Sequence, residues 1–89
     1  MTRAEPIFSM GVTLIHANAK SVLADGLEQI GAGATGVDCA RLTRFDSSAL
    51  AVLLAWRRAG RARGIEFEIK GLPAGLLSLT QAYGIDALL

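Results

Sequence analysis

A strand, a turn and a helix follow one another between Val37 and Arg61, and this succession constrains the fold more than any other feature of the chain. Residues 37–40 are short and mostly apolar, as is typical of a buried strand. After a polar turn, the unbroken apolar run 49–56 predicts a helix over about 47–61. A strand that leads directly into a helix is characteristic of an α/β domain.

Strand and helix patterns alternate along the rest of the chain as well. The chain is expected to begin with a strand pair over 6–16, which has a tight turn at Gly11, and a helix over about 19–31, which is capped by Asn18. A strand over 37–40 and the helix over 47–61 follow. Then come a strand over 64–70, in which apolar and charged residues alternate, and a last helix from Pro73 to Gly84. This alternation predicts a sheet with parallel neighbours that are connected by crossover helices.

Composition predicts one small domain over residues 1–89. Apolar residues make up 52% of the 89 residues, which is enough to build a core. The longest apolar run is far shorter than the roughly 20 residues that span a bilayer. Pro6 interrupts the start, so we expect no signal peptide. The single cysteine, Cys39, fits a reducing compartment and a place in the core, and we therefore expect a cytoplasmic protein.

Charge is nearly balanced overall but is unevenly distributed. The nine basic and eight acidic residues give no reason to expect a nucleic-acid partner. Six arginines nevertheless gather in a window where only Asp46 opposes them: Arg41, Arg44, Arg57, Arg58, Arg61 and Arg63. They form either a basic face that attracts an acidic partner or lipid headgroups, or the solvated flank of a helix and its loop.

No pattern predicts catalysis. The G-x-G-x-x-G string at 31–36 follows a helix and precedes a strand, which reverses the order of a dinucleotide-binding site. His16 is the only histidine, and no nucleophile elbow surrounds a serine, so we expect neither a hydrolase triad nor a zinc site. Asp38 and Asp46 are candidates for an acid–base pair, but a strand-end acid and a helix cap explain them more simply. We expect no catalytic residue, no metal and no cofactor.

The start of the helix over 47–61 is a candidate site of recognition. Asp46 is placed to cap the helix, because its carboxylate can accept hydrogen bonds from the free N–H groups of the first turn. The hydroxyls of Ser47 and Ser48 then lie at the positive end of the helix, which favours an anion such as a phosphate placed on serine. These serines therefore indicate recognition or modification by a partner.

The same helix carries two apolar stripes, where a helix that covers a sheet needs only one. The stripes are Leu50, Leu53 and Leu54 in the first, and Ala49, Val52, Trp56 and Ala59 in the second. The second stripe either packs against a neighbouring helix or binds a partner through Trp56, because tryptophan is enriched at interface hot spots. The candidate partner interface consists of Val52, Trp56 and Arg57.

The segments Val37-Asp38 and Phe45-Asp46-Ser47-Ser48-Ala49-Leu50 resemble the signature of STAS domains, and the resemblance extends from about Val12 to Leu89. It implies an α/β fold with a four- to five-stranded mixed sheet and helices packed mainly on one face. In antagonists of anti-sigma factors, the serine after the motif aspartate is phosphorylated, and Ser47 corresponds to it. Asp46, Ser48 and Ala49 complete the motif, with Ala49 in place of the usual glycine.

Two further stretches resemble the MlaB-type branch, the small STAS subunit of a phospholipid-transport ABC system. They are Leu53-Leu54-Ala55-Trp56-Arg57-Arg58-Ala59, and Gly71-Leu72-Pro73 with the ending Tyr83-Gly84-Ile85-Asp86-Ala87-Leu88-Leu89. The resemblance implies a non-enzymatic subunit that binds the ATPase of the transporter, supports lipid asymmetry and reaches the inner membrane only through that complex. The alternative is an antagonist of an anti-sigma factor, switched when a serine kinase phosphorylates Ser47.

Overall fold

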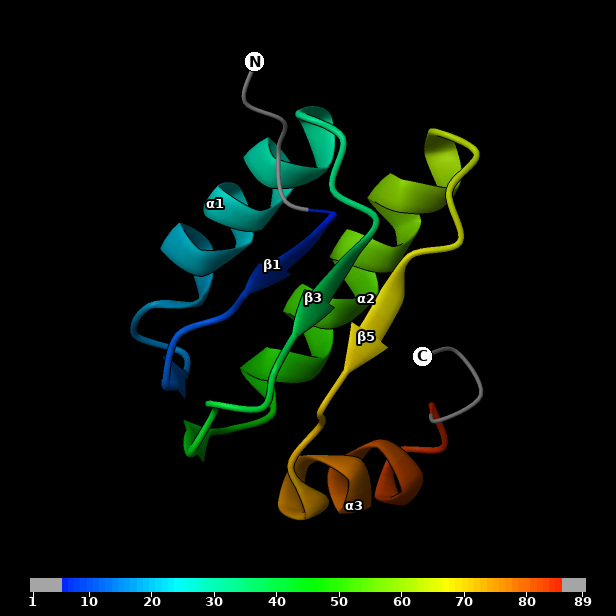
Figure 1. Cartoon of the computed structure of the whole chain (residues 1–89). Helices are drawn as coiled ribbons and strands as arrows, with labels where there is room; N and C mark the ends of the chain where they lie inside the picture. The colour runs from blue at the N-terminus through cyan, green and yellow to red at the C-terminus, as the bar shows by residue number, and fades with distance from the viewer. Residues whose placement is uncertain (1–5, 86–89) are drawn as a thin grey trace.

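A computed structural model describes residues 6–85, which form three helices and five short strands (Figure 1). In chain order they are β1 (Ile7–Ser9), β2 (Thr13–Leu14), α1 (Ala19–Gly31), β3 (Gly36–Asp38), β4 (Arg44–Phe45), α2 (Ser48–Ala62), β5 (Glu68–Lys70) and α3 (Ala74–Ala82). The predicted α/β alternation is confirmed, and each helix begins within one residue of its expected start. None of the helices within 6–85 has both the length and the apolar character needed to cross a membrane.

The described strands form two parallel sheets and not one mixed sheet. β3 lies between β1 and β5, and β2 pairs with β4. The predicted strand pair over 6–16 is wrong, because both of its halves bind the same distant part of the chain. Met10 N–H donates to the Asp38 carbonyl, and the Val12 carbonyl accepts from Thr43 and Arg44. The short strand β4 therefore arises where the sequence indicated only a turn.

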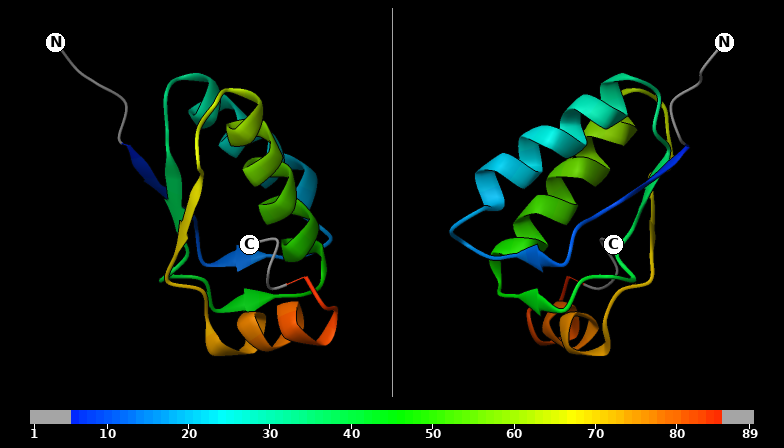
Figure 2. Two further views of the ribbon diagram at one scale, coloured as in Figure 1. Left: turned by 90° about the vertical axis from the view of Figure 1, so that its right-hand side faces the viewer. Right: turned by 60° about the vertical axis from the view of Figure 1, so that its left-hand side comes forward.

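The helices α1 and α2 cover one face of the three-stranded sheet, as predicted, and α3 lies beyond its end next to the two-stranded sheet (Figures 1 and 2). The loop before α1 is closed by Asn18, whose side chain accepts from Ile15 N–H and donates to the Thr13 carbonyl. Asn18 does occupy the N-cap position of α1, but its side chain makes no capping bond. The predicted N-cap position is therefore confirmed, and the Asn18 side chain binds the preceding loop instead of the helix.

The core lies between the sheet and the two long helices, and Trp56 is its largest fully buried side chain. Its ring packs edge-on against Phe8 of β1, with centroids 5.3 Å apart, and its Nε1 donates to the Leu23 carbonyl at 3.1 Å. Gly26 allows α1 to approach this closely, because a Cβ there would lie 2.1 Å from the indole ring. Trp56, the largest residue of the second apolar stripe of α2, therefore packs on α1 and β1.

Candidate functional site

The carboxylate of Asp46 connects the start of α2 to the chain that follows β2. Its Oδ2 accepts from His16 N–H at 3.0 Å, and its Oδ1 accepts from Ser48 N–H at 2.8 Å. These bonds hold the pKa of Asp46 below its ordinary value of 3.8, the His16 bond contributing most, because they stabilise the ionised carboxylate. Asp46 therefore accepts from the first turn as predicted, although the N-cap position itself is held by Ser47.

Asp46 should make stability depend on pH in acid. Because its folded pKa is lowered, its contribution is present above the ordinary value of 3.8 and is lost as the pH falls through the lower, folded value. Asp46→Asn should therefore be less stable than the wild type at pH 7; the difference should start to narrow as the pH falls below 3.8 and should close only below the lower, folded pKa. Thermal unfolding between pH 2.5 and 7 measures this.

The matched control is Asp25→Asn, at an exposed position of α1 whose carboxylate accepts none of the hydrogen bonds found within residues 6–85. It should follow the wild type at every pH. A constant gap between Asp46→Asn and the wild type down to pH 2.5 would contradict a role of the ionised carboxylate.

The other motif residues differ in their access to a partner. Ser47 is exposed, and its hydroxyl makes no capping bond. Ser48 is half-buried, and Ala49 is fully buried at 0% exposure. Ala49 faces the core, so its replacement of the usual glycine does not affect how closely a partner approaches. Ser47 is therefore the motif residue that an incoming protein reaches first.

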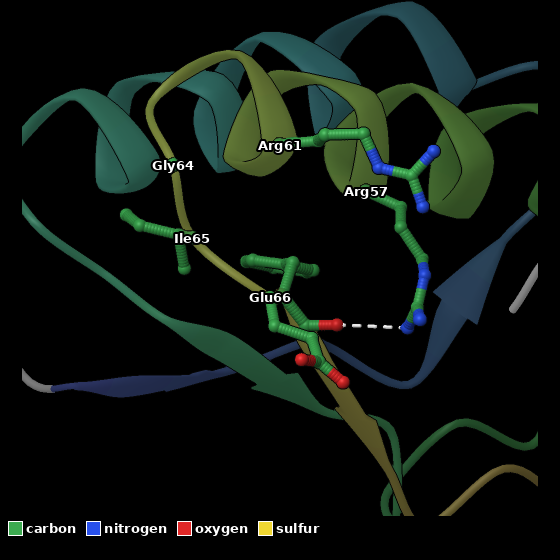
Figure 3. Close-up of a pocket in the computed structure, with 6 residues that line it drawn as sticks. Arg57, Arg61, Gly64, Ile65 and Glu66 are labelled. Carbon is green, nitrogen blue, oxygen red and sulfur yellow. Dashed lines mark hydrogen bonds between the residues drawn. The ribbon is translucent and has the colours of Figure 1, made fainter.

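The predicted partner interface of Val52, Trp56 and Arg57 is corrected by the structure. Trp56 is 1% exposed and belongs to the core, so the prediction that it anchors a partner is wrong. Val52 is 4% exposed and only lines the side of a surface groove. Arg57 is half-buried, and its Nη1 donates to the Phe67 carbonyl at 2.9 Å, which attaches α2 to the chain entering β5 (Figure 3).

The six arginines do not form one basic face. Arg41 and Arg44 precede α2, whereas the other four follow from its middle to just beyond its end. The 15 residues of α2 extend about 22 Å at 1.5 Å per residue. Glu66 shares a pocket with Arg57 and Arg61 (Figure 3), so a negative charge offsets this group. This arrangement agrees better with the interpretation of the arginines as the solvated flank of a helix and its loop than with the interpretation as one basic face.

Two apolar grooves that the sequence analysis did not predict flank the first turns of α2. The α1 groove lies between α1 and α2 and is lined by Ala19, Lys20, Leu23, Ser48, Ala51 and Val52. The α3 groove lies between α2 and the end of α3 and is lined by Ser47, Leu50, Ala51, Leu54, Tyr83 and Ile85. Exposed Ala51 belongs to both, and Tyr83 is 60% exposed. The site is therefore a surface for contact with apolar groups, bordered by the hydroxyls of Ser47, Ser48 and Tyr83.

Of the residues considered for chemistry, His16 and Asp46 lie together beside Ser47, joined by the bond from the His16 N–H to the Asp46 carboxylate, whereas Cys39 and Asp38 belong to the end of β3. Cys39 is fully buried, and burial, with a smaller effect of Asp38, raises the pKa of its thiol to about 11, so the thiol stays protonated at neutral pH. The Asp38 carboxylate accepts from Ala40 N–H in the loop after β3. Within residues 6–85 no group of three or more histidine, cysteine or acidic side chains converges in a way that could hold a metal ion.

Comparison with known proteins identifies one family. The family model described as "Mlab, STAS domain" matches residues 3–89. This match includes the Asp46-Ser47-Ser48 motif, both grooves and the ending of the chain. No curated protein matches the sequence at a significant level.

Proposed function

The chain belongs to the STAS domain family in its MlaB type, and on this basis we propose that it is a non-enzymatic accessory subunit of a phospholipid-transport ABC transporter. It binds the ATPase subunit, supports the assembly and activity of the transporter, and thereby maintains lipid asymmetry. Its place is the cytoplasmic side of the inner membrane, which it reaches through the complex.

The start of α2 carries this proposal. Ser47 and Ala51 are exposed between two grooves that are lined mainly by apolar side chains, which is the character of a protein-docking surface. Both carboxylate oxygens of Asp46 accept backbone hydrogen bonds, so this acid is engaged in holding the helix start. The lowered pKa of Asp46 makes its carboxylate a weaker base than a free aspartate, and we therefore favour binding over catalysis.

Co-expression with the ATPase subunit of the Mla-type transporter from the same organism tests the proposal. We expect the two chains to elute together from size-exclusion chromatography and the ATPase activity to depend on this chain. The ATPase subunit of an unrelated importer from the same cells is the control and should elute separately. Separate elution of the Mla-type pair, with unchanged ATPase activity, would contradict the proposal.

A second candidate function is supported by the exposure of Ser47. Its hydroxyl makes no capping bond, and a phosphate there would lie at the favourable N-terminus of α2. In this alternative the chain is an antagonist of an anti-sigma factor, and a partner serine kinase controls it. Intact mass after incubation with ATP and the cognate kinase should then show one phosphate, absent from Ser47→Ala. An unmodified wild-type mass would exclude this function.

A further inference from the structure

We propose that the ATPase subunit binds by inserting one apolar side chain into each groove beside α2, with Ala51 as the ridge between the two. A carboxylate of the same segment then faces Lys20. This inference rests on the proposed function and specifies how the partner is recognised. In this proposal the aromatic residue that contacts the partner is Tyr83, directly after α3, and not the buried Trp56.

The shape of the surface indicates that one segment of the partner lies across α2 and reaches both grooves. The α1 groove has a volume of about 290 Å³ and the α3 groove about 430 Å³, and Ala51 lines both. Because Ala51 is exposed and ends in a methyl group, it separates the grooves by a low ridge that a single segment can cross. One segment that fills both grooves fixes its position along the helix and across it.

The chemistry of the lining favours an apolar protein segment. Among the described residues that line the grooves, Lys20 is the only charged side chain. Arg57 and Arg61 lie on the later turns of α2 and line other pockets. Tyr83 offers a large, exposed ring on the side of the α3 groove, and tyrosine is among the residues enriched at interface hot spots. A phosphate or nucleic acid would find a single cation here.

Charge complementarity identifies the polar part of the partner. Lys20 is exposed at the rim of the α1 groove, and no carboxylate among the described residues lines that groove with it. A carboxylate on the partner would be attracted to this position, and it would fix which way the segment runs across α2. Because the pair lies at an exposed rim, its contribution should weaken as salt is added.

Calorimetric titration of the full chain with the purified ATPase subunit tests the inference through three variants. Tyr83→Ala removes one side of the α3 groove, and Ala51→Leu places a branched side chain on the ridge between the grooves. Each should weaken binding by about 10-fold or more, as expected for the centre of an interface. Lys20→Glu should weaken binding most at low salt, with the difference from wild type narrowing as salt is added. Circular dichroism should show wild-type folding for all three.

Leu77→Ala is the matched control, because Leu77 is an exposed apolar residue of α3, at 43%, that lines neither groove. It should bind as the wild type does. The decisive variant is Ala51→Leu, since a general apolar patch would bind the partner equally well or more tightly with an added apolar side chain. If Ala51→Leu binds as tightly as the wild type or more tightly, and the wild type binds the ATPase subunit, the two-groove inference is wrong but the proposed function is not affected.

Two other outcomes would also overturn the inference. Absence of binding by the wild type would remove the proposed function and the inference together. The second outcome is that the wild type binds phosphatidylglycerol vesicles and that Ala51→Leu and Tyr83→Ala lose this binding but keep the wild-type affinity for the ATPase subunit. The grooves would then bind lipid and not the ATPase subunit.

Discussion

Trp56→Ala should lower the free energy of unfolding by about 3–5 kcal/mol, the range found for removal of large buried aromatic side chains. Trp56 is 1% exposed and fills the space between Phe8 and α1, opposite the bare backbone of Gly26. Its loss leaves a cavity that the helices cannot close without moving. Since small domains have total stabilities of about 5–15 kcal/mol, this single change should remove a large part of the stability of the domain. Urea unfolding followed by circular dichroism measures the effect.

Trp56→Phe is the control that separates packing from the indole hydrogen bond. It keeps an aromatic ring next to Phe8 but loses the donor to the Leu23 carbonyl, so its stability should lie between those of Trp56→Ala and the wild type. A Trp56→Ala variant that unfolds at the same urea concentration as the wild type, yet no longer binds the ATPase subunit, would restore the interpretation of Trp56 as an interface anchor.

Ser47→Asp should leave folding intact and weaken binding to the ATPase subunit by about 10- to 100-fold, because a charge that loses water in an interface without a partner costs a few kcal/mol. The folded chain tolerates the change, since Ser47 is exposed and a negative charge at a helix N-terminus is favourable by about 0.3–1 kcal/mol. Thermal unfolding and calorimetric titration of the same preparation measure the two effects separately.

Ser47→Ala is the matched neutral control for this prediction. It removes the hydroxyl without adding charge, so it should bind within a few-fold of the wild type. Equal affinity of Ser47→Asp and the wild type would show that position 47 remains hydrated in the complex, and the docking surface would then have to lie elsewhere.

The helices could be predicted because their signals are local. The apolar run 49–56 and the caps around it lie within one segment, and α1 (Ala19–Gly31) matches the expected range. The strand pairing could not be predicted in the same way. β2 pairs with β4 in the register Thr13 with Arg44, and nothing in the two-residue strands themselves specifies that partner. The local pattern therefore favoured a hairpin that the fold does not contain.

In the candidate site, too, the local features could be predicted and the features that depend on tertiary contacts could not. Asp46 and Ser47 were recognisable because a helix start is a local feature of the sequence. The burial of Trp56 depends on Gly26 in another helix, and the one available signal was a glycine in the middle of a helical pattern, which often marks close packing. The grooves depend on where α1 and α3 lie relative to Ala51, so only the tertiary structure reveals them.

Amide hydrogen exchange of the chain, free and bound to the purified ATPase subunit, tests the central claim most directly. The ends of a helix open locally more readily than its middle, so a bound protein should slow amide exchange there visibly. We predict added protection over residues 47–54 and at 83–85, with residues 57–63 unchanged. Protection confined to 57–63, with the start of α2 exchanging as in the free chain, would contradict docking at this surface.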